Sequence, residues 1–236
     1  EYDALNRLVT SRDSLGNVMT TEYDPLGRVA SVTSATGQTT RYGYDALGRL
    51  TRVTDSAGGV VTYTYDANGN RTSMTDPNGN VTTHAFDAMN RLTTVTGPLG
   101  GVTTLEYDAV GNLIRRTDPK GQSISFSYDA LDRRVGIDYP TQPDVTETYD
   151  PVGNLLTVTN GIGTTVHEYD AIGRRTRTTD VFGNVIEFGY DANGNRTSLT
   201  YPGGDIVTYL YDAANQLTAD NDWLAGTTTY GYDPTA

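Results

Sequence analysis

The sequence predicts an all-β fold in which tandem antiparallel hairpins of about 21 residues form one long coiled or spiral sheet. An aromatic residue followed by Asp recurs twelve times in 236 residues, and every interval is 21 residues except the 20 between Tyr149 and Tyr169. Turn-forming residues recur every ten or eleven positions, which leaves no room for a helix. Threonine and tyrosine, which are typical of strands, fill the segments between the turns. We therefore expect a repeat array in which each repeat packs mainly on its neighbours.

The first turn of each repeat follows the aromatic residue and has the pattern Asp-x-x-Gly, as in Asp45-Ala46-Leu47-Gly48. Asp at the first position can accept a backbone hydrogen bond from two residues on, and Gly at the fourth supplies a positive φ. Where Gly is missing, the residue is one that tolerates the left-handed region, namely Asn6, Asn90, Asp132 or Asn215. This pattern predicts a type I turn followed by a left-handed residue, a common hairpin connection.

The second turn begins ten residues after the first Asp, as in Asp76-Pro77-Asn78-Gly79. Between the turns lie about six to eight residues of Val, Leu, Thr and Tyr, so each repeat is a hairpin. Alternation of period two places the residues four, two and zero positions before the aromatic on one face, for example Val61, Tyr63 and Tyr65.

The closing of the first turn fixes the register of the hairpin. It would place Tyr44 opposite Leu50 and Asp45 opposite Arg49, and such cross-strand pairs contribute roughly 0.2–1 kcal/mol each. An odd period would turn successive tyrosines to opposite faces if both turns were three-residue loops of the same kind. We therefore expect a β-bulge or an uneven turn in every repeat.

One region departs from the pattern. The 20-residue interval should disturb the register between Gly163 and Tyr169, and Tyr139–Asp144 replaces the usual second turn. We expect a kink there. About 22 strands would make a ribbon that twists, coils or closes. Because Thr and Arg interrupt both faces, we expect no solid apolar core, but a shell with a wet interior or a ribbon packed on its own turns.

Composition limits the classes of partner. The net charge is −12, the basic residues occur singly, and only Lys120 is a lysine, which argues against nucleic acid or an anionic membrane surface. No apolar run approaches the ~18 residues of a membrane span. The absence of cysteine in a repetitive chain suits a secreted or cell-surface setting. Residues 1–236 are predicted to form a single array of about 11 repeats that begins in mid-repeat, as a segment of a longer chain.

Three Asp-x-Asn-Gly-Asn strings, which begin at Asp66, Asp76 and Asp191, resemble the start of a calcium loop. Calcium hands need Gly at the sixth position and a bidentate Glu at the twelfth, and both are missing here. His84 and His167 each lie two positions before an aromatic, without a second ligand at metal spacing, so we interpret them as aromatic substitutes. We expect no metal site and no cofactor.

The sequence contains no pattern that is typical of a catalytic site. A catalytic acid–base pair is singular, whereas Asp-Arg pairs follow turn after turn and are predicted to be cross-strand ties. The chain has no nucleophile elbow, phosphate loop or cysteine nucleophile, so we predict that it is not an enzyme. Rows of tyrosine could alternatively bind extended glycans or peptides by stacking. Trp223, in an irregular last turn, is predicted to be partly exposed and to be a contact site at most.

These motifs resemble the YD-repeat family, also called Rhs repeats, over essentially the whole chain. Tyr-Asp-x-x-Gly-Arg-Leu followed by Thr-Asp-x-x-Gly-Asn is specific at this copy number. The residues that carry the structural motif are Tyr2, Asp3, Tyr23, Asp24, Gly27, Tyr44, Asp45, Gly48, Arg49, Tyr65, Asp66, Gly69, Phe86, Asp87, Tyr107, Asp108, Gly111, Tyr128, Asp129, Tyr149, Asp150, Gly153, Tyr169, Asp170, Gly173, Tyr190, Asp191, Gly194, Tyr211, Asp212, Tyr232 and Asp233.

The resemblance implies a β-ribbon that spirals into a hollow cocoon. Such shells enclose a C-terminal toxin polypeptide in bacterial Rhs proteins and in the B/C components of Tc toxins, and a similar shell serves adhesion in teneurins. The first hypothesis is therefore a non-catalytic section of a secreted bacterial shell that encapsulates and delivers a toxin. Its partners would be the rest of its own chain and the enclosed toxin. The alternative is an extracellular fibre or cell-surface adhesin whose repeats associate end to end with each other or bind glycans.

Overall fold

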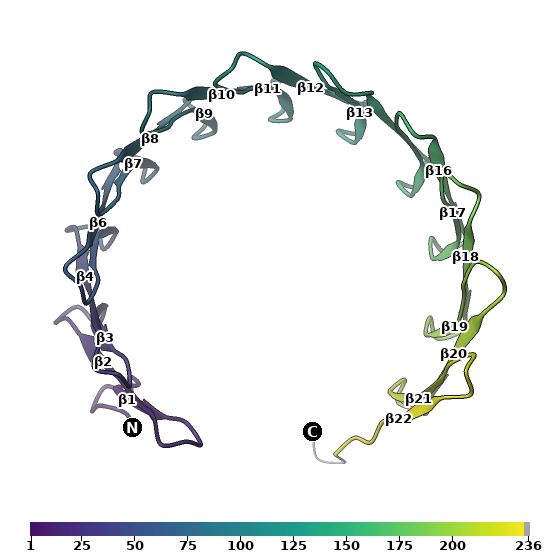
Figure 1. Ribbon diagram of the computed structural model, residues 1–236, viewed down its shortest axis with the longest axis horizontal. Helices are drawn as coiled ribbons and strands as arrows, with labels where there is room; N and C mark the ends of the chain where they lie inside the picture. The colour runs from purple at the N-terminus through teal and green to yellow at the C-terminus, as the bar shows by residue number, and fades with distance from the viewer. Residues whose placement is uncertain (234–236) are drawn as a thin grey trace. The chain divides into compact units, whose positions relative to one another are not determined.

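The computed structural model describes residues 1–233, and this part of the chain contains strands and turns but no helix (Figure 1). The chain forms two compact bodies, an N-terminal body of Glu1–Ser123 and a C-terminal body that starts at Ile124. The predicted all-β antiparallel fold and the predicted number of strands are confirmed for the described residues, which form 22 strands.

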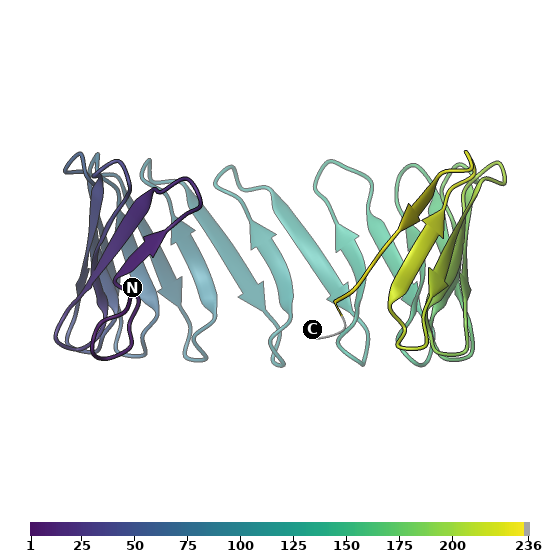
Figure 2. The same cartoon turned by 90° about the horizontal axis from the view of Figure 1, so that it is seen from below.

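In the N-terminal body each strand pairs antiparallel with the next one in the chain. Figure 2 shows the connecting turns at the two ends of the strands, so first turns lie along one edge of the sheet and second turns along the other. The strands are β1 (Thr10–Arg12), β2 (Val18–Tyr23), β3 (Val29–Thr33), β4 (Thr39–Tyr44), β5 (Leu50–Thr54), β6 (Val60–Tyr65), β7 (Arg71–Thr75), β8 (Val81–Phe86), β9 (Leu92–Thr96), β10 (Val102–Tyr107) and β11 (Leu113–Thr117).

The C-terminal body repeats the same arrangement of consecutive antiparallel strands. Its strands are β12 (Ser123–Tyr128), β13 (Arg134–Asp138), β14 (Val145–Tyr149), β15 (Leu155–Thr159), β16 (Thr164–Tyr169), β17 (Arg175–Thr179), β18 (Val185–Tyr190), β19 (Arg196–Thr200), β20 (Ile206–Tyr211), β21 (Leu217–Asn221) and β22 (Thr227–Thr229).

The two turns of a repeat have the same geometry. In the first turn the N–H of Asp45 donates to the carbonyl of Arg49 at 3.0 Å, and that of Gly48 donates to Asp45 at 3.0 Å. The second turn at Asp76 forms the same pair of bonds. The predicted left-handed positions are confirmed, with φ between 59° and 62° at Asn6, Asn90, Asp132 and Asn215. The last turn, which we expected to be irregular, has this geometry too and places Ala225 at φ 61°.

Each first-turn hairpin contains the β-bulge that the odd period requires. Gly43 pairs with Arg52 and Tyr44 pairs with Leu50, as predicted, so Thr51 is the extra residue. The same register shift precedes the aromatic residue in nine other first-turn hairpins of the described residues. Because one bulge per repeat offsets the odd period, the tyrosines stay on one face.

Burial follows this alternation in β8, β16 and β20. In β8 the residues on the aromatic face, Thr82, His84 and Phe86, are half-buried, whereas the residues between them are exposed. Only Ala219 and Ser31 are buried among the described residues, at 8% and 5% exposure, which bears out the expectation that there is no solid core.

The two faces of the sheet carry different side chains. Cross-strand rows on the aromatic face include Tyr42–Val53–Val61. The opposite face carries small and polar rows such as Thr64–Ser73–Thr83. The aromatic face is therefore the more apolar one in these rows.

The predicted register disturbance between Gly163 and Tyr169 is wrong. The missing residue is absorbed in the turn, where the N–H of Asn160 donates to the carbonyl of Gly163 at 2.9 Å across a two-residue loop. Val166, three residues before Tyr169, then pairs with Thr157, just as Thr104, three residues before Tyr107, pairs with Thr94.

The neighbouring segment Tyr139–Asp144 is irregular, as predicted. There the N–H of Tyr139 donates to the Asp144 carboxylate at 3.1 Å. The pairing of Gly136 with Thr146 nevertheless keeps the regular register. A Cβ at Gly161 would collide with Pro143, so the two irregular turns contact each other.

Candidate functional site: the links between repeats

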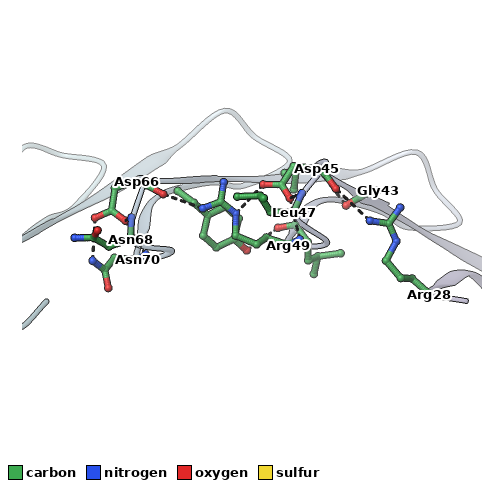
Figure 3. Close-up of polar contacts among 11 residues, drawn as sticks. Arg28, Gly43, Asp45, Leu47, Arg49, Asp66, Asn68 and Asn70 are labelled. Carbon is green, nitrogen blue, oxygen red and sulfur yellow. Dashed lines mark hydrogen bonds and ion pairs between the residues drawn. The ribbon is translucent and has the colours of Figure 1, made fainter. Parts of the chain in front are cut away.

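The motif residues form contacts within one turn and across to the next repeat, which we call the inter-repeat link. Figure 3 shows the link built by Asp45, Arg49 and Asp66. Asp45 Oδ1 accepts the N–H groups of Leu47 and Arg49, both at 2.9 Å, and Oδ2 accepts Arg49 Nε at 2.7 Å. The carboxylate therefore closes its own turn and also fixes the arginine.

The arginine then reaches the following repeat. Arg49 Nη1 donates to the backbone carbonyl of Asp66 at 2.8 Å, and its Cζ lies 4.7 Å from the centroid of the Tyr65 ring. The Tyr65 hydroxyl donates back to the carbonyl of Leu50 at 2.6 Å. Two hydrogen bonds and one cation–π contact thus join two successive repeats.

The link recurs at other repeats. The bond from arginine to the next Asp carbonyl and the stacking on the next tyrosine are repeated by Arg28, Arg91, Arg133 and Arg174. The hydroxyl bond to the preceding repeat is repeated by Tyr23, Tyr44, Tyr107, Tyr169, Tyr190, Tyr211 and Tyr232. Phe86 occupies this position without a hydroxyl.

A second kind of link uses asparagine. Asn70 Nδ2 donates to Asp66 Oδ2 at 2.9 Å and to Asn90 Oδ1 at 2.8 Å, and Asn68 also donates to Asn90 at 2.9 Å. Asn193 and Asn195 make the equivalent bonds to Asn215.

Sequence reasoning interpreted Asn90 and Asn215 only as substitutes for glycine and missed their role as acceptors. The available signal was that each follows an Asn-Gly-Asn turn by one repeat.

Both kinds of link lower the pKa of the turn carboxylate below its usual 3.8. For Asp45 the main cause is the hydrogen bond from the Arg49 backbone, opposed by partial loss of water and supported by the Arg49 side chain. For Asp66 it is the Asn70 amide. A carboxylate with a lowered pKa is a weak base near neutral pH, so these groups are poorly suited to proton abstraction.

The structure does not bring the two histidines together with other ligands. Burial, followed by the charge of Arg71, lowers the pKa of His84, and His167 Nδ1 lies 3.0 Å from Thr178 Oγ1. Within residues 1–233 no group of three or more His, Cys, Asp or Glu side chains could hold a metal ion. Trp223 is 48% exposed, as predicted, and meets the Tyr201 ring edge-on with centroids 5.3 Å apart.

Comparison with known families agrees with this geometry. The RHS Repeat family matches four overlapping stretches, residues 2–39, 23–60, 44–81 and 65–103. The Teneurin YD-shell family matches residues 100–236, more than half of the chain. The chain belongs to the YD-shell family. The predicted resemblance is confirmed, and this family is a structural one.

Solved structures show the same YD-shell fold. A crystal structure of TcdB2-TccC3 has a TM-score of 0.57 and 17% identity over 99% of this chain and 18% of that chain. The Tc holotoxin pore of Photorhabdus luminescens has a TM-score of 0.57 and 17% identity over 87% of this chain and 13% of that one.

The chain thus spans less than a fifth of the proteins whose fold it shares. A search of curated proteins finds no significant match. No helix that could cross a membrane occurs in the described residues.

Proposed function

We propose that this YD-shell chain is a non-catalytic scaffold, part of the wall of a secreted shell that encapsulates and delivers a toxin polypeptide. The observation that carries the proposal is the use of the motif side chains. Asp45, Arg49 and Tyr65 are each bonded within or between repeats, so the most repeated chemistry of the chain holds the ribbon together.

The same observation argues against catalysis. The carboxylates of Asp45, Asp66 and Asp170 are held ionised by donors from their own turns, and turns of this kind recur along both bodies. We propose that the motif residues have a structural role throughout and that the chain is not an enzyme. Scaffolding is also consistent with a sheet that lacks a solid core and exposes both faces to some extent.

The partners follow from the family and from the fold comparisons. We propose the remainder of a longer chain and an enclosed toxin polypeptide as partners, and a secreted or cell-surface location in bacteria. The similar fold in Tc toxin structures supports this proposal, and the small share of those chains that is matched fits a wall segment.

The proposal is tested on the full-length protein by negative-stain electron microscopy combined with limited proteolysis. We expect closed hollow particles in which a polypeptide is protected from protease until the shell is opened by denaturant. Open ribbons in the micrographs would contradict the encapsulation proposal. So would a toxin polypeptide that protease digests at once, before any denaturant is added.

A second candidate is an extracellular fibre or adhesin in which repeats associate with each other or bind glycans. Exposed apolar side chains at the turns favour association, as with Leu26 and Leu47, each 75% exposed. Glycan binding by the tyrosine row is less favoured, because hydroxyls such as that of Tyr65 already donate to backbone carbonyls. Continuous filaments in the same micrographs would support the second candidate over the first.

A further inference from the structure

The first turns carry a row of exposed apolar side chains at their third position, which we call the tip row. The turn is short and solvated, so these side chains are 66–84% exposed although they are apolar. In the N-terminal body the tip row consists of Leu5, Leu26, Leu47, Met89 and Val110, and in the C-terminal body of Leu131, Val152 and Ile172.

The turn does not require an apolar residue at this position. Asn68 replaces it in the N-terminal body, and its N–H donates to Asp66 Oδ1 at 3.0 Å, much as the N–H of Leu47 donates to Asp45 at 2.9 Å. The position tolerates a polar side chain without loss of the turn geometry. The apolar character therefore points to a contact outside the turn.

The second-turn edge differs in both side chains and charge. In the N-terminal body its third positions are mixed and are, in chain order, Leu15, Thr36, Ala57, Asn78, Leu99 and Lys120. Its carboxylates are bonded to neutral groups, as Asp76 is to Asn80. At the first-turn edge of the N-terminal body, four of the six carboxylates are paired with an arginine four residues later, and the other two are bonded to an asparagine; the paired ones are Asp3, Asp24, Asp45 and Asp87, and the other two are Asp66 and Asp108. Two first-turn edges can therefore approach each other with less charge repulsion than two second-turn edges.

The spacing of the tip row selects its partner. Successive tips are separated by two strands, roughly 10 Å at ~4.8 Å per strand. A gap of that size accepts one apolar side chain from an opposing row with the same period. A partner with another spacing would meet one or two tips only.

We propose that the first-turn edge is an interface that docks against the first-turn edge of a second copy of this repeat array. The contact is self-complementary, since the same edge is used on both chains. Neither the enclosed cargo nor the unpaired strands at the ends of the array are needed for it, so it is independent of the encapsulation proposal and specifies the surface through which repeats of two chains would associate.

The test compares matched pairs of leucines in the N-terminal body. One variant carries Leu26→Asn and Leu47→Asn at the first-turn edge, and the control carries Leu15→Asn and Leu99→Asn at the second-turn edge, where the leucines are equally exposed or more so. Circular dichroism checks that both variants fold like the wild type.

Sedimentation velocity over a concentration series then measures self-association. We expect a wild-type dimer, a dissociation constant at least about tenfold weaker in the first-edge variant, and no change in the control. A wild-type chain that stays monomeric at all concentrations would overturn the proposal. An equal weakening of dimerisation in both variants would show that exposed leucines at either edge promote nonspecific association, and it would overturn the proposal as well.

The absence of native cysteine allows a second measurement. Single-cysteine chains made at Leu26, Leu47 and Met89 are mixed and oxidised, and we expect disulfide-linked dimers among them. Chains with Leu99→Cys should remain uncrosslinked under the same conditions. Cross-links that form as readily through position 99 would refute an interface at the first-turn edge.

Discussion

The arginine and asparagine links occupy the same turn position and tie the ribbon in different ways. Arg49 spans from Asp45 to the next repeat, where it bonds the Asp66 carbonyl and stacks on Tyr65. Asn70 is shorter and bonds Asp66 and the side chain of Asn90. The arginine link joins two repeats through a charged guanidinium, which reaches a backbone carbonyl and an aromatic ring of the next repeat. The asparagine link joins two turns through neutral side-chain amides.

The link after Asn70 also lacks a tyrosine hydroxyl, because the next aromatic is Phe86. Arg71 instead stacks on Tyr63, 5.4 Å from the ring centroid. The arginine link therefore makes more direct contacts to the next repeat. We expect the free energy of unfolding to respond more strongly to changes in arginine links than in asparagine links.

Acid is expected to have the largest effect, because both kinds of link depend on an ionised carboxylate. The pKa values of Asp45 and Asp66 are lowered from 3.8 in the folded chain, so their contribution to stability is fully present above 3.8. It is lost as the pH falls through the lower folded values, when both turns lose their acceptors. Urea unfolding at a series of pH values measures this loss. A stability that stays constant or rises as the pH falls below 3.8 would contradict it.

Removing the carboxylate of each kind of link in turn compares how much the two links contribute to stability. Asp45→Ala removes the acceptor for Leu47 and Arg49 and leaves a half-buried guanidinium without its ion pair. We expect a larger loss in the free energy of unfolding for Asp45→Ala than for Asp66→Ala, because the partners of Asp66 are neutral. Urea unfolding of both variants checks this order, and equal losses would remove the proposed advantage of the arginine link.

Arg49→Asn converts one kind of link into the other. The variant keeps a donor for Asp45 but loses the bond to the Asp66 carbonyl and the stacking on Tyr65, at an expected cost of about 1–2 kcal/mol. Hydrogen exchange of the amides in β5 and β6 should accelerate more than elsewhere. Arg12→Asn is the matched control, since Arg12 donates only a long 3.4 Å bond to the Gly16 carbonyl.

Tyr65→Phe tests the hydroxyl alone and imitates Phe86. It keeps the ring under Arg49 and removes the 2.6 Å bond to the Leu50 carbonyl, for an expected loss of about 1 kcal/mol. Phe86→Tyr is the reverse change, and a gain there would show that the carbonyl of the preceding repeat is in reach. A neutral Tyr65→Phe would mean that water replaces the hydroxyl without cost.

The local structure could be predicted from the sequence where one residue type has one conformational reason. Asn at position 6 and Asp at position 132 predicted positive φ. The odd period predicted a bulge or an uneven turn in each repeat, and the structure has the bulge, at Thr51 in the hairpin of β4 and β5. The contacts of Arg49 to the next repeat could not be predicted, because they depend on how far two hairpins lie apart. The 20-residue interval misled us for a similar reason: a turn can shorten at Asn160–Gly163 without shifting the strands.

Asn90 is the residue at which the sequence interpretation was incomplete, and Asn90→Gly tests what it adds. Glycine relaxes a backbone held at φ 61°, a gain of about 1 kcal/mol, but removes the acceptor for Asn68 and Asn70. We expect the two effects to nearly cancel, with a net change within about 0.5 kcal/mol. Asn6→Gly serves as the control and should be stabilising, because Asn6 has a φ of 60° and its side chain accepts no hydrogen bond within residues 1–233. If both changes raise the free energy of unfolding equally in urea, the hydrogen bonds from Asn68 and Asn70 to Asn90 contribute nothing to stability, and the asparagine link does not stabilise the contact between repeats.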